Sequence, residues 1–206
     1  RFDPGILYYM PQIWTSDDTD AVERLKIQYG TSIVYPLVTM GAHVSAAPNH
    51  QVGRVTPLAT RGDVALFGNM GYELDVTRLD PEEKAAIQAQ VVRYKRLRAL
   101  IHRGDFYRLL SPFEGNETAW MVVAKDRREV LVGFYRVLAQ PNPRPSRLRL
   151  VGLDPALEYE LVGQGERWDG DQLMEVGLTV EPYLANTGGD FQSVVLHWRA
   201  VGPGKE

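Results

Sequence analysis

The stretch GILYYMPQIWTSDDTDAVERLKIQYG, residues 5–30, decides the fold of the first half of this chain. Its apolar run at 5–14 predicts a buried strand. Asp20, followed three residues later by Glu23, is a capping-box pattern that predicts a helix beginning at Ala21. A strand that leads directly into a helix is the repeating unit of α/β folds. The carboxylates between the two therefore lie at the carboxyl end of a strand, which is the catalytic face of a (β/α)8 barrel.

The same alternation of strands and helices continues to residue 111. Strands are predicted at 42–46 and 71–76, and a short helix at 60–67. A long helix is predicted to begin at Pro81 and to end before Gly104, because Asp80 is a favoured N-cap and proline is tolerated at the first helical position. This order predicts the last three units of a (β/α)8 barrel, which needs about eight strands to close.

After Ser111–Pro112 the pattern changes to short, β-branched or alternating runs separated by turn residues, which predicts an antiparallel β-sandwich. The predicted strands are 118–124, 129–137, 147–151, 158–162, 177–180 and 193–199. The proline-rich stretch 140–145 cannot supply the N–H groups of a ladder and is predicted to be a loop. We therefore expect two domains, a partial barrel at 1–111 and a sandwich at 112–206. Only the sandwich is expected to fold by itself, because three barrel units leave apolar strand edges uncovered.

The composition is that of a globular protein. Of the 206 residues 44% are hydrophobic and 24% are charged, and the net charge of −3 gives no signal for a nucleic-acid partner. With no cysteine, disulfides and thiolate metal sites are excluded, and a reducing, cytoplasmic location is weakly favoured. No apolar run approaches the roughly 18 residues that would span a membrane.

A long stretch of the sequence resembles a known enzyme family. Residues 1–36, RFDPGILYYMPQIWTSDDTDAVERLKIQYGTSIVYP, closely resemble the acid/base region of the family 36 glycoside hydrolases, the melibiase-type α-galactosidases. The resemblance continues through MGAHVSAAPNH at 40–50 and TRGDVALFGNMGYELD at 60–75, and more loosely through the rest of the chain.

The resemblance implies an activity and a role for one residue. The first aspartate of the family's W-x-S-D motif, its general acid/base, falls on Asp17. The family's nucleophilic aspartate lies in an upstream K-W-D-type strand that is missing here, so we interpret this chain, which opens at Arg1, as the C-terminal portion of a retaining α-galactosidase. The substrate implied is a terminal α-galactoside of the raffinose or melibiose type, with no cofactor or metal. The implied protein partners are the upstream part of the barrel and further copies in a homo-oligomer such as a tetramer.

The residues around Asp17 each have a structural alternative. From spacing alone, Asp17 is either a helix cap or solvated carboxylate, or the acid/base. Asp18 either supports the site and contacts substrate or simply faces water. Trp14 is either a sugar platform at a strand end or a wall of the core. Asp20 is best explained as the N-cap, because its spacing to Glu23 satisfies two otherwise unpaired N–H groups.

Other polar residues are assigned mainly structural roles. His43, His50 and Asn49 follow on the next strand and its loop, and two histidines seven apart without further ligands make poor metal spacing. Arg1 and Asp3 either line the rim of the active site or form a salt bridge. Structural roles are also expected for the last barrel strand's Tyr72, Glu73 and Asp75. The aromatics predicted to fill the core and edges of the sandwich are Trp120, Phe134, Tyr135, Trp168, Tyr183 and Trp198.

Two functions from different classes remain. The first is an enzyme portion that carries the acid/base but not the nucleophile, and is therefore expected to be inactive alone because the oxocarbenium-like transition state lacks its second carboxylate. The second is a non-catalytic module, in which the sandwich binds carbohydrate or mediates oligomerisation and the partial barrel supports it.

Overall fold

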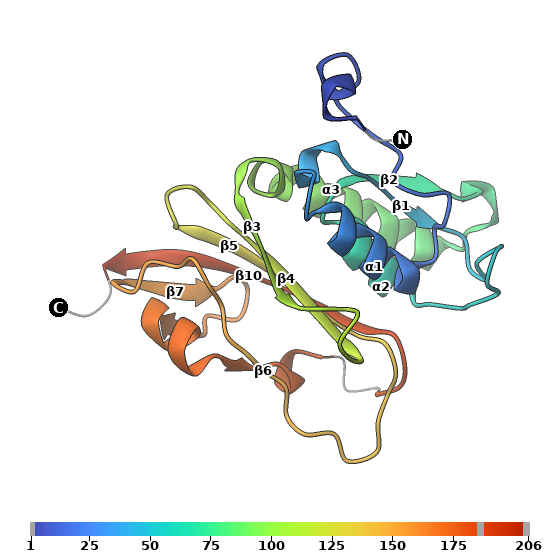
Figure 1. The fold of residues 1–206 in the computed structure, drawn as a ribbon. Helices are drawn as coiled ribbons and strands as arrows, with labels where there is room; N and C mark the ends of the chain where they lie inside the picture. Colours follow the sequence, from blue (N-terminus) through green and yellow to red (C-terminus); the bar gives the residue numbers. More distant parts are fainter. Residues whose placement is uncertain (1–2, 185–187, 204–206) are drawn as a thin grey trace. The chain divides into compact units, whose positions relative to one another are not determined.

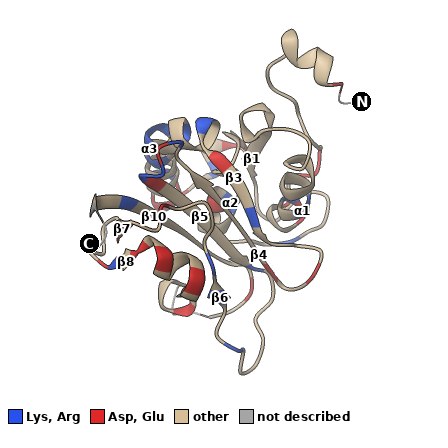
Figure 2. Cartoon of the chain, turned by 60° about the vertical axis from the view of Figure 1, so that its left-hand side comes forward, with Lys and Arg blue, Asp and Glu red and all other residues tan. Residues whose placement is uncertain are grey.

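The computed structural model of the chain describes residues 3–184 and 188–203 (Figure 1). The chain divides into two compact units, Arg1–His102 and Arg103–Glu206. Basic and acidic residues are distributed over the elements of both units, and acidic side chains are frequent around strand β8 (Arg167–Asp169) and the turn that follows it (Figure 2). None of the helices in the described ranges is long and apolar enough to cross a membrane.

From helix α1 onward, the first unit alternates helices and strands in the predicted order. Its elements are η1 (Pro4–Tyr8), α1 (Ala21–Thr31), η2 (Leu37–Thr39), β1 (Gly41–Ser45), α2 (Leu58–Ala65), β2 (Asn69–Glu73), η3 (Val76–Arg78) and α3 (Pro81–Arg103). Strands β1 and β2 pair in parallel, with Gly41 opposite Asn69 and Ser45 opposite Glu73. Parallel pairing of strands separated by a helix is the βαβ arrangement that the alternation predicts.

The two faces of the β1–β2 sheet differ because successive side chains of a strand point in opposite directions. Ala42 and Val44 are fully buried and pack with Ala65 of α2. Partly buried Leu58, Met70, Tyr72 and Leu74 complete this cluster on the helix-covered face. The opposite face carries the alternate residues of both strands, including His43 and Glu73.

The predicted strand at 5–14 is wrong over most of its length. Residues Pro4–Tyr8 form a short 3-10 helix, in which the Gly5 amide donates to Asp3 Oδ1 at 2.8 Å, and only Ile13 forms a parallel bridge, with Met40. A strand needs neighbouring strands to pair its N–H and C=O groups. Within the described ranges the parallel sheet consists of β1 and β2 alone, so residues 5–12 have no strand to pair with. Asp3 therefore caps a helix, while Arg1 lies outside the described residues.

The second unit is built on a six-stranded antiparallel sheet of order β3-β4-β5-β10-β7-β8. These strands are β3 (Asp105–Leu110), β4 (Glu117–Val123), β5 (Glu129–Arg136), β7 (Leu157–Leu161), β8 (Arg167–Asp169) and β10 (Gln192–Pro203). A second, two-stranded sheet pairs β6 (Arg147–Leu148) with β9 (Leu178–Thr179). Short helical turns η4 (Gln172–Val176) and η5 (Glu181–Tyr183) flank it. The second layer is therefore much smaller than the first.

One face of the six-stranded sheet supports the main core. Side chains of β4, β5 and β10 pack there against β6, β9 and η4, for example Phe134 and Trp198 in one cluster with Leu148, Leu173 and Leu178. Trp120 and Tyr135 are also fully buried. Trp168 and Tyr183 are partly buried against the core. The prediction that the sandwich aromatics serve the core and its edges is confirmed.

The sequence patterns missed two strands. Strand β3 lies before the predicted boundary at Ser111–Pro112, yet it pairs antiparallel with β4 and belongs to the second unit. It follows α3 almost directly, so its apolar residues extend the pattern of the helix. Strand β8, with only three residues, is too short to show an alternating pattern.

Candidate active site

The loop between Ile13 and helix α1 holds three aspartates in different roles. Asp20 Oδ2 accepts hydrogen bonds from the amides of Val22 and Glu23, both at 3.1 Å, which confirms Asp20 as the N-cap. Asp18 Oδ1 accepts a hydrogen bond from the amide of Asp20 at 3.0 Å. Both carboxylates therefore support the loop and the first turn of the helix.

Asp17 is the aspartate of the three that is exposed. Its Oδ1 accepts a hydrogen bond from the indole Nε1 of Trp14 at 3.1 Å. Because Asp20 serves as the N-cap, the interpretation of Asp17 as a helix cap is excluded. An exposed carboxylate that lies beside an aromatic ring is suited to proton transfer with a bound molecule.

Trp14 lies against the face of the β1–β2 sheet that carries His43. Its ring lies near the imidazole of His43, with centroids 4.4 Å apart and planes inclined by 59°. The side chain remains 37% exposed. Trp14 therefore packs against His43 on one side and keeps part of its surface accessible, which is compatible with both a sugar platform and a wall residue.

His43 and Glu73 lie side by side on the same face. His43 Nδ1 and Glu73 Oε2 are 3.6 Å apart, longer than a hydrogen bond. Burial lowers the pKa of His43, and the attraction of the Glu73 carboxylate opposes this without cancelling it. The imidazole is therefore neutral at pH 7.

A buried arginine fixes this loop to the sheet. Arg24 of α1 donates from Nη1 to Thr15 Oγ1 and from Nη2 to the carbonyl of Gly41, both at 2.7 Å. Burial lowers the pKa of Arg24 to about 10, although the charge of Asp18 raises it, so the guanidinium remains charged at neutral pH. Sequence patterns did not identify Arg24, because its burial depends on a strand that lies later in the chain.

The loop after β1 contributes structural contacts. Asn49 Nδ2 donates to Thr19 Oγ1 at 3.2 Å, and Ser45 Oγ donates to the carbonyl of Thr19 at 3.1 Å. Arg54 forms an ion pair with Asp20. His50 is exposed. These contacts support the structural interpretation of Asn49.

Two polar residues of the last predicted barrel strand, Tyr72 and Asp75, make structural contacts. Tyr72 lies on the helix-covered face, where its hydroxyl donates to Gln90 Oε1 at 2.9 Å and burial raises its pKa to about 12. Asp75 accepts from the amide of Thr77 at 3.0 Å and caps η3. In the described parts of the chain, no group of three or more His, Cys, Asp or Glu side chains has the arrangement of a metal site.

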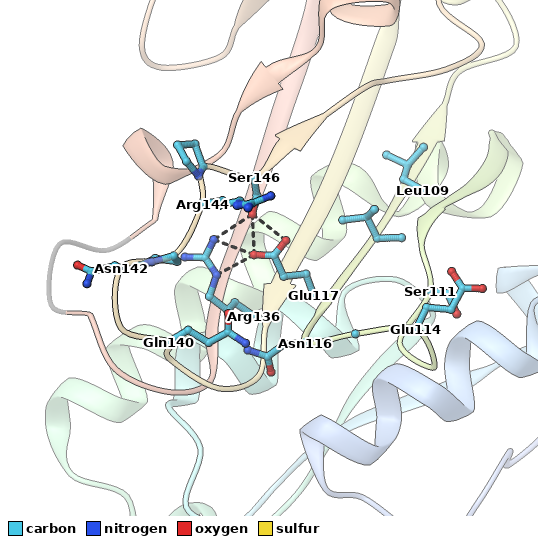
Figure 3. Close-up of a pocket in the computed structure, with 14 residues that line it drawn as sticks. Leu109, Ser111, Glu114, Asn116, Glu117, Arg136, Gln140, Asn142, Arg144 and Ser146 are labelled. Atoms are coloured by element: carbon cyan, nitrogen blue, oxygen red, sulfur yellow. Dashed lines mark hydrogen bonds and ion pairs between the residues drawn. The ribbon is translucent and has the colours of Figure 1, made fainter.

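A separate cavity of about 720 Å³ lies in the second unit beside the proline-rich segment 140–145 (Figure 3). Arg136 Nε donates to Glu117 Oε1 at 2.9 Å, and Ser146 Oγ donates to the same oxygen at 2.6 Å. Arg136 Nη2 also donates to Glu181 Oε1 at 2.8 Å. These hydrogen bonds link the segment to the sheet, although Glu181 Oε2 is buried without a hydrogen-bond partner.

Comparison with known proteins identifies the family. Residues 1–104 match the family model described as Melibiase, and residues 117–198 match the glycosyl hydrolase family 36 C-terminal domain. The chain belongs to glycoside hydrolase family 36. The resemblance seen in the sequence is thereby confirmed.

Similar proteins cover nearly all of this family 36 chain. The α-galactosidase AgaA of Geobacillus stearothermophilus is 59% identical over 201 residues, which are 98% of this chain and 27% of AgaA. Mel36A of Lactobacillus acidophilus is 45% identical over the same shares. A crystal structure of an AgaA variant in complex with raffinose superposes with a TM-score of 0.92 at 58% identity, covering 98% of this chain and 27% of that one. The family 36 chain thus spans about a quarter of the length of these relatives.

Proposed function

We propose that this chain is the portion of a retaining α-galactosidase that carries the acid/base, with Asp17 in that role and the nucleophile in another part of the complete enzyme. The observation that carries the proposal is that the three aspartates of the loop before α1 make different contacts. Asp20 caps α1 and Asp18 accepts from the loop backbone, whereas Asp17 is exposed and hydrogen-bonded to Trp14. Terminal α-galactosides of the raffinose or melibiose type are the proposed substrates, since an AgaA variant is described in complex with raffinose.

The chemistry follows from the two-carboxylate mechanism. Asp17 protonates the glycosidic oxygen while a second carboxylate attacks the anomeric carbon, giving a covalent glycosyl-enzyme. Asp17 then takes a proton from the water that hydrolyses this intermediate. Retaining enzymes hold the two carboxyl groups about 5–5.5 Å apart. A chain with only one of them leaves the transition state unsupported, so we propose that it is inactive alone.

The first unit suits a role as the end of a (β/α)8 barrel. Its helices cover one face of the parallel β1–β2 sheet, and the other face carries Trp14, His43 and Glu73. Large apolar side chains near the amino terminus and after α1 are exposed, namely Tyr8, Tyr9, Met10, Ile33 and Val34. Burial by further barrel units would remove this apolar surface from water.

The test is hydrolysis of p-nitrophenyl α-galactoside by the chain alone, by the chain mixed with the upstream portion of the parent protein, and by the complete enzyme. We expect turnover only in the last two cases, and its loss in Asp17→Ala. Added azide should restore turnover of the variant with a good leaving group, because azide needs no general base. Turnover at ordinary enzymatic rates by the 206-residue chain alone would refute the proposal.

A matched variant distinguishes the aspartates. Asp18→Asn keeps an oxygen that accepts from the Asp20 amide, so we expect the complete enzyme to retain most of its activity. Loss of activity in Asp18→Asn but not in Asp17→Asn would move the acid/base role to Asp18.

The alternative of a non-catalytic carbohydrate-binding module finds less support. Trp120, Phe134, Tyr135 and Trp198 are all buried, so these rings are not available for stacking on a sugar. Galactose binding by residues 103–206 at an affinity equal to that of the complete enzyme would favour the module instead.

A further inference from the structure

Two aromatic rings lie on glycines beside Asp17. A Cβ added at Gly41 would come within 3.0 Å of Cε3 of the Trp14 indole. A Cβ at Gly71 would come within 2.8 Å of both Cδ2 and Nε2 of His43. Any side chain at 71 would therefore displace the imidazole. The reason for glycine at these positions is space and not backbone conformation, since neither has a positive φ.

The two rings hold each other in place. The Trp14 indole lies over Gly41 and also contacts His43, and the centroids of the indole and the imidazole are 4.4 Å apart. His43 sits over Gly71, opposite it in the β1–β2 register, with Glu73 near Nδ1. Close contacts from the Gly41 backbone and from the tilted His43 ring restrict the torsions of the indole, so its N–H points in one direction.

That direction is toward Asp17. The indole Nε1 donates to Asp17 Oδ1 at 3.1 Å, and among the described residues no hydrogen bond engages Asp17 Oδ2. One oxygen of the carboxyl group is thus held and the other is left for proton transfer. We infer that His43, seated on Gly71, is a positioning residue for the acid/base: it orients Trp14, and the Trp14 indole in turn aims the Asp17 carboxyl group. This inference rests on the proposed role of Asp17.

A residue that positions the general acid affects hydrolysis differently for different leaving groups. A sugar leaving group departs poorly without protonation, so its hydrolysis depends on a well-aimed general acid. A dinitrophenolate leaves without a proton. Because kcat/KM reports the steps up to formation of the covalent intermediate, misaiming Asp17 lowers kcat/KM for melibiose and leaves that for a dinitrophenyl α-galactoside almost unchanged.

The experiment compares these two substrates in the complete enzyme for three variants. Gly71→Ala moves the His43 ring without replacing Trp14 or Asp17. Trp14→Phe keeps an aromatic ring and removes the N–H donor. Gly30→Ala is the matched control, because a Cβ at Gly30 meets nothing within 4 Å.

We expect Gly71→Ala and Trp14→Phe to lower kcat/KM for melibiose by about tenfold to a hundredfold, and that for the dinitrophenyl substrate by less than about threefold. Gly30→Ala should change neither. Equal losses on both substrates, or no loss on melibiose, would overturn the inference. Should Gly71→Ala fail to fold, His43→Ala, which removes the ring that contacts Trp14, takes its place in the same comparison.

The outcome is separable from the test of Asp17 itself. If Asp17→Ala retains melibiose hydrolysis, the proposed function fails. If Asp17→Ala abolishes it while both ring variants show no leaving-group dependence, the proposed function stands and the positioning role of His43 is wrong. A rise in KM for both substrates in Trp14→Phe, with Gly71→Ala unchanged, would instead assign Trp14 to substrate contact and also overturn the inference.

Discussion

Asp20 and Arg54 form an ion pair that ties the amino end of α1 to the loop after β1. The side chain of Asp20 is 1% exposed, and the same oxygen that meets Arg54 accepts the amides of Val22 and Glu23. Three donors therefore converge on one buried carboxylate oxygen. Of the three aspartates in the loop before α1, the N-cap Asp20 thus makes the most contacts with the structure, whereas Asp17, the proposed acid/base, is exposed.

Asp20→Ala should destabilise the first unit by about 2 kcal/mol, because it removes two capping hydrogen bonds and leaves Arg54 without this partner. Hydrogen exchange of the α1 amides measures the change. Asp20→Asn keeps an acceptor for the two amides and should cost less. Asp75→Ala, which removes the exposed cap of η3, serves as the control and should have a much smaller effect. Equal protection of α1 in all three variants would contradict the prediction.

Arg24→Met should destabilise the first unit by about 2 kcal/mol, even though it removes a buried charge. The substitution leaves the carbonyl of Gly41 and the hydroxyl of Thr15 without their donor. Slower exchange or unchanged protection of the β1 amides would show that the guanidinium does not brace the loop. The exposed Lys26 on the same helix offers Lys26→Met as the control.

The stability of the first unit should fall as the pH drops below about 6.5. Burial is the largest cause that lowers the pKa of both His43 and His102 from their ordinary value. For His43, the Glu73 carboxylate raises the pKa in part, and the charge of Arg24 lowers it further. For His102, a hydrogen bond with the Gly68 backbone raises the pKa in part, and the charge of Arg98 lowers it further. Below the pKa of an unfolded histidine, the unfolded chain therefore binds more protons than the folded chain, and the folded state loses stability. Above that pH the histidines are neutral in both states and their contribution to stability is fully present.

Amide protection in β1 and α3, measured at pH 7.5 and 5.5, tests this dependence. We expect lower protection factors at pH 5.5 and a smaller change in His43→Gln. Higher protection at the lower pH would mean that the folded state favours the charged imidazoles.

Protonation of Glu181 should lower the stability of the second unit as the pH falls below about 4.5. Burial raises the pKa of Glu181, but the hydrogen bonds from the Ser146 amide and the Arg136 guanidinium outweigh it, so the pKa lies below its ordinary value. The carboxylate therefore stabilises the fold above about pH 4.5, and this contribution is lost as the pH falls further. The protection factor of the Ser146 amide should fall with it. Glu181→Gln should remove that dependence, and a dependence that survives the substitution must come from another group.

Local patterns predicted several elements correctly. The helix beginning at Ala21 follows from its N-cap Asp20, and the long helix from Pro81 follows from Asp80, because capping and helical periodicity involve residues only a few positions apart. The reciprocal bond of the predicted capping box is not formed, because the Asp20 amide donates to Asp18 and not to Glu23. The amide of Glu83 indeed donates to Asp80 Oδ1 at 2.7 Å. The exposed Asp17 was also found in the sequence, since the W-x-S-D motif is contiguous.

By itself, then, the sequence determined the order of strands and helices from α1 to α3, the family, and the aspartate proposed as acid/base. The tertiary structure decided that residues Pro4–Tyr8 are helical, that β3 joins the second unit, and that His43 lies against Trp14 over Gly71. Sequence periodicity reports which face of an element is apolar. It does not report which residue of a distant strand comes opposite, and that register is set by the packing of whole elements.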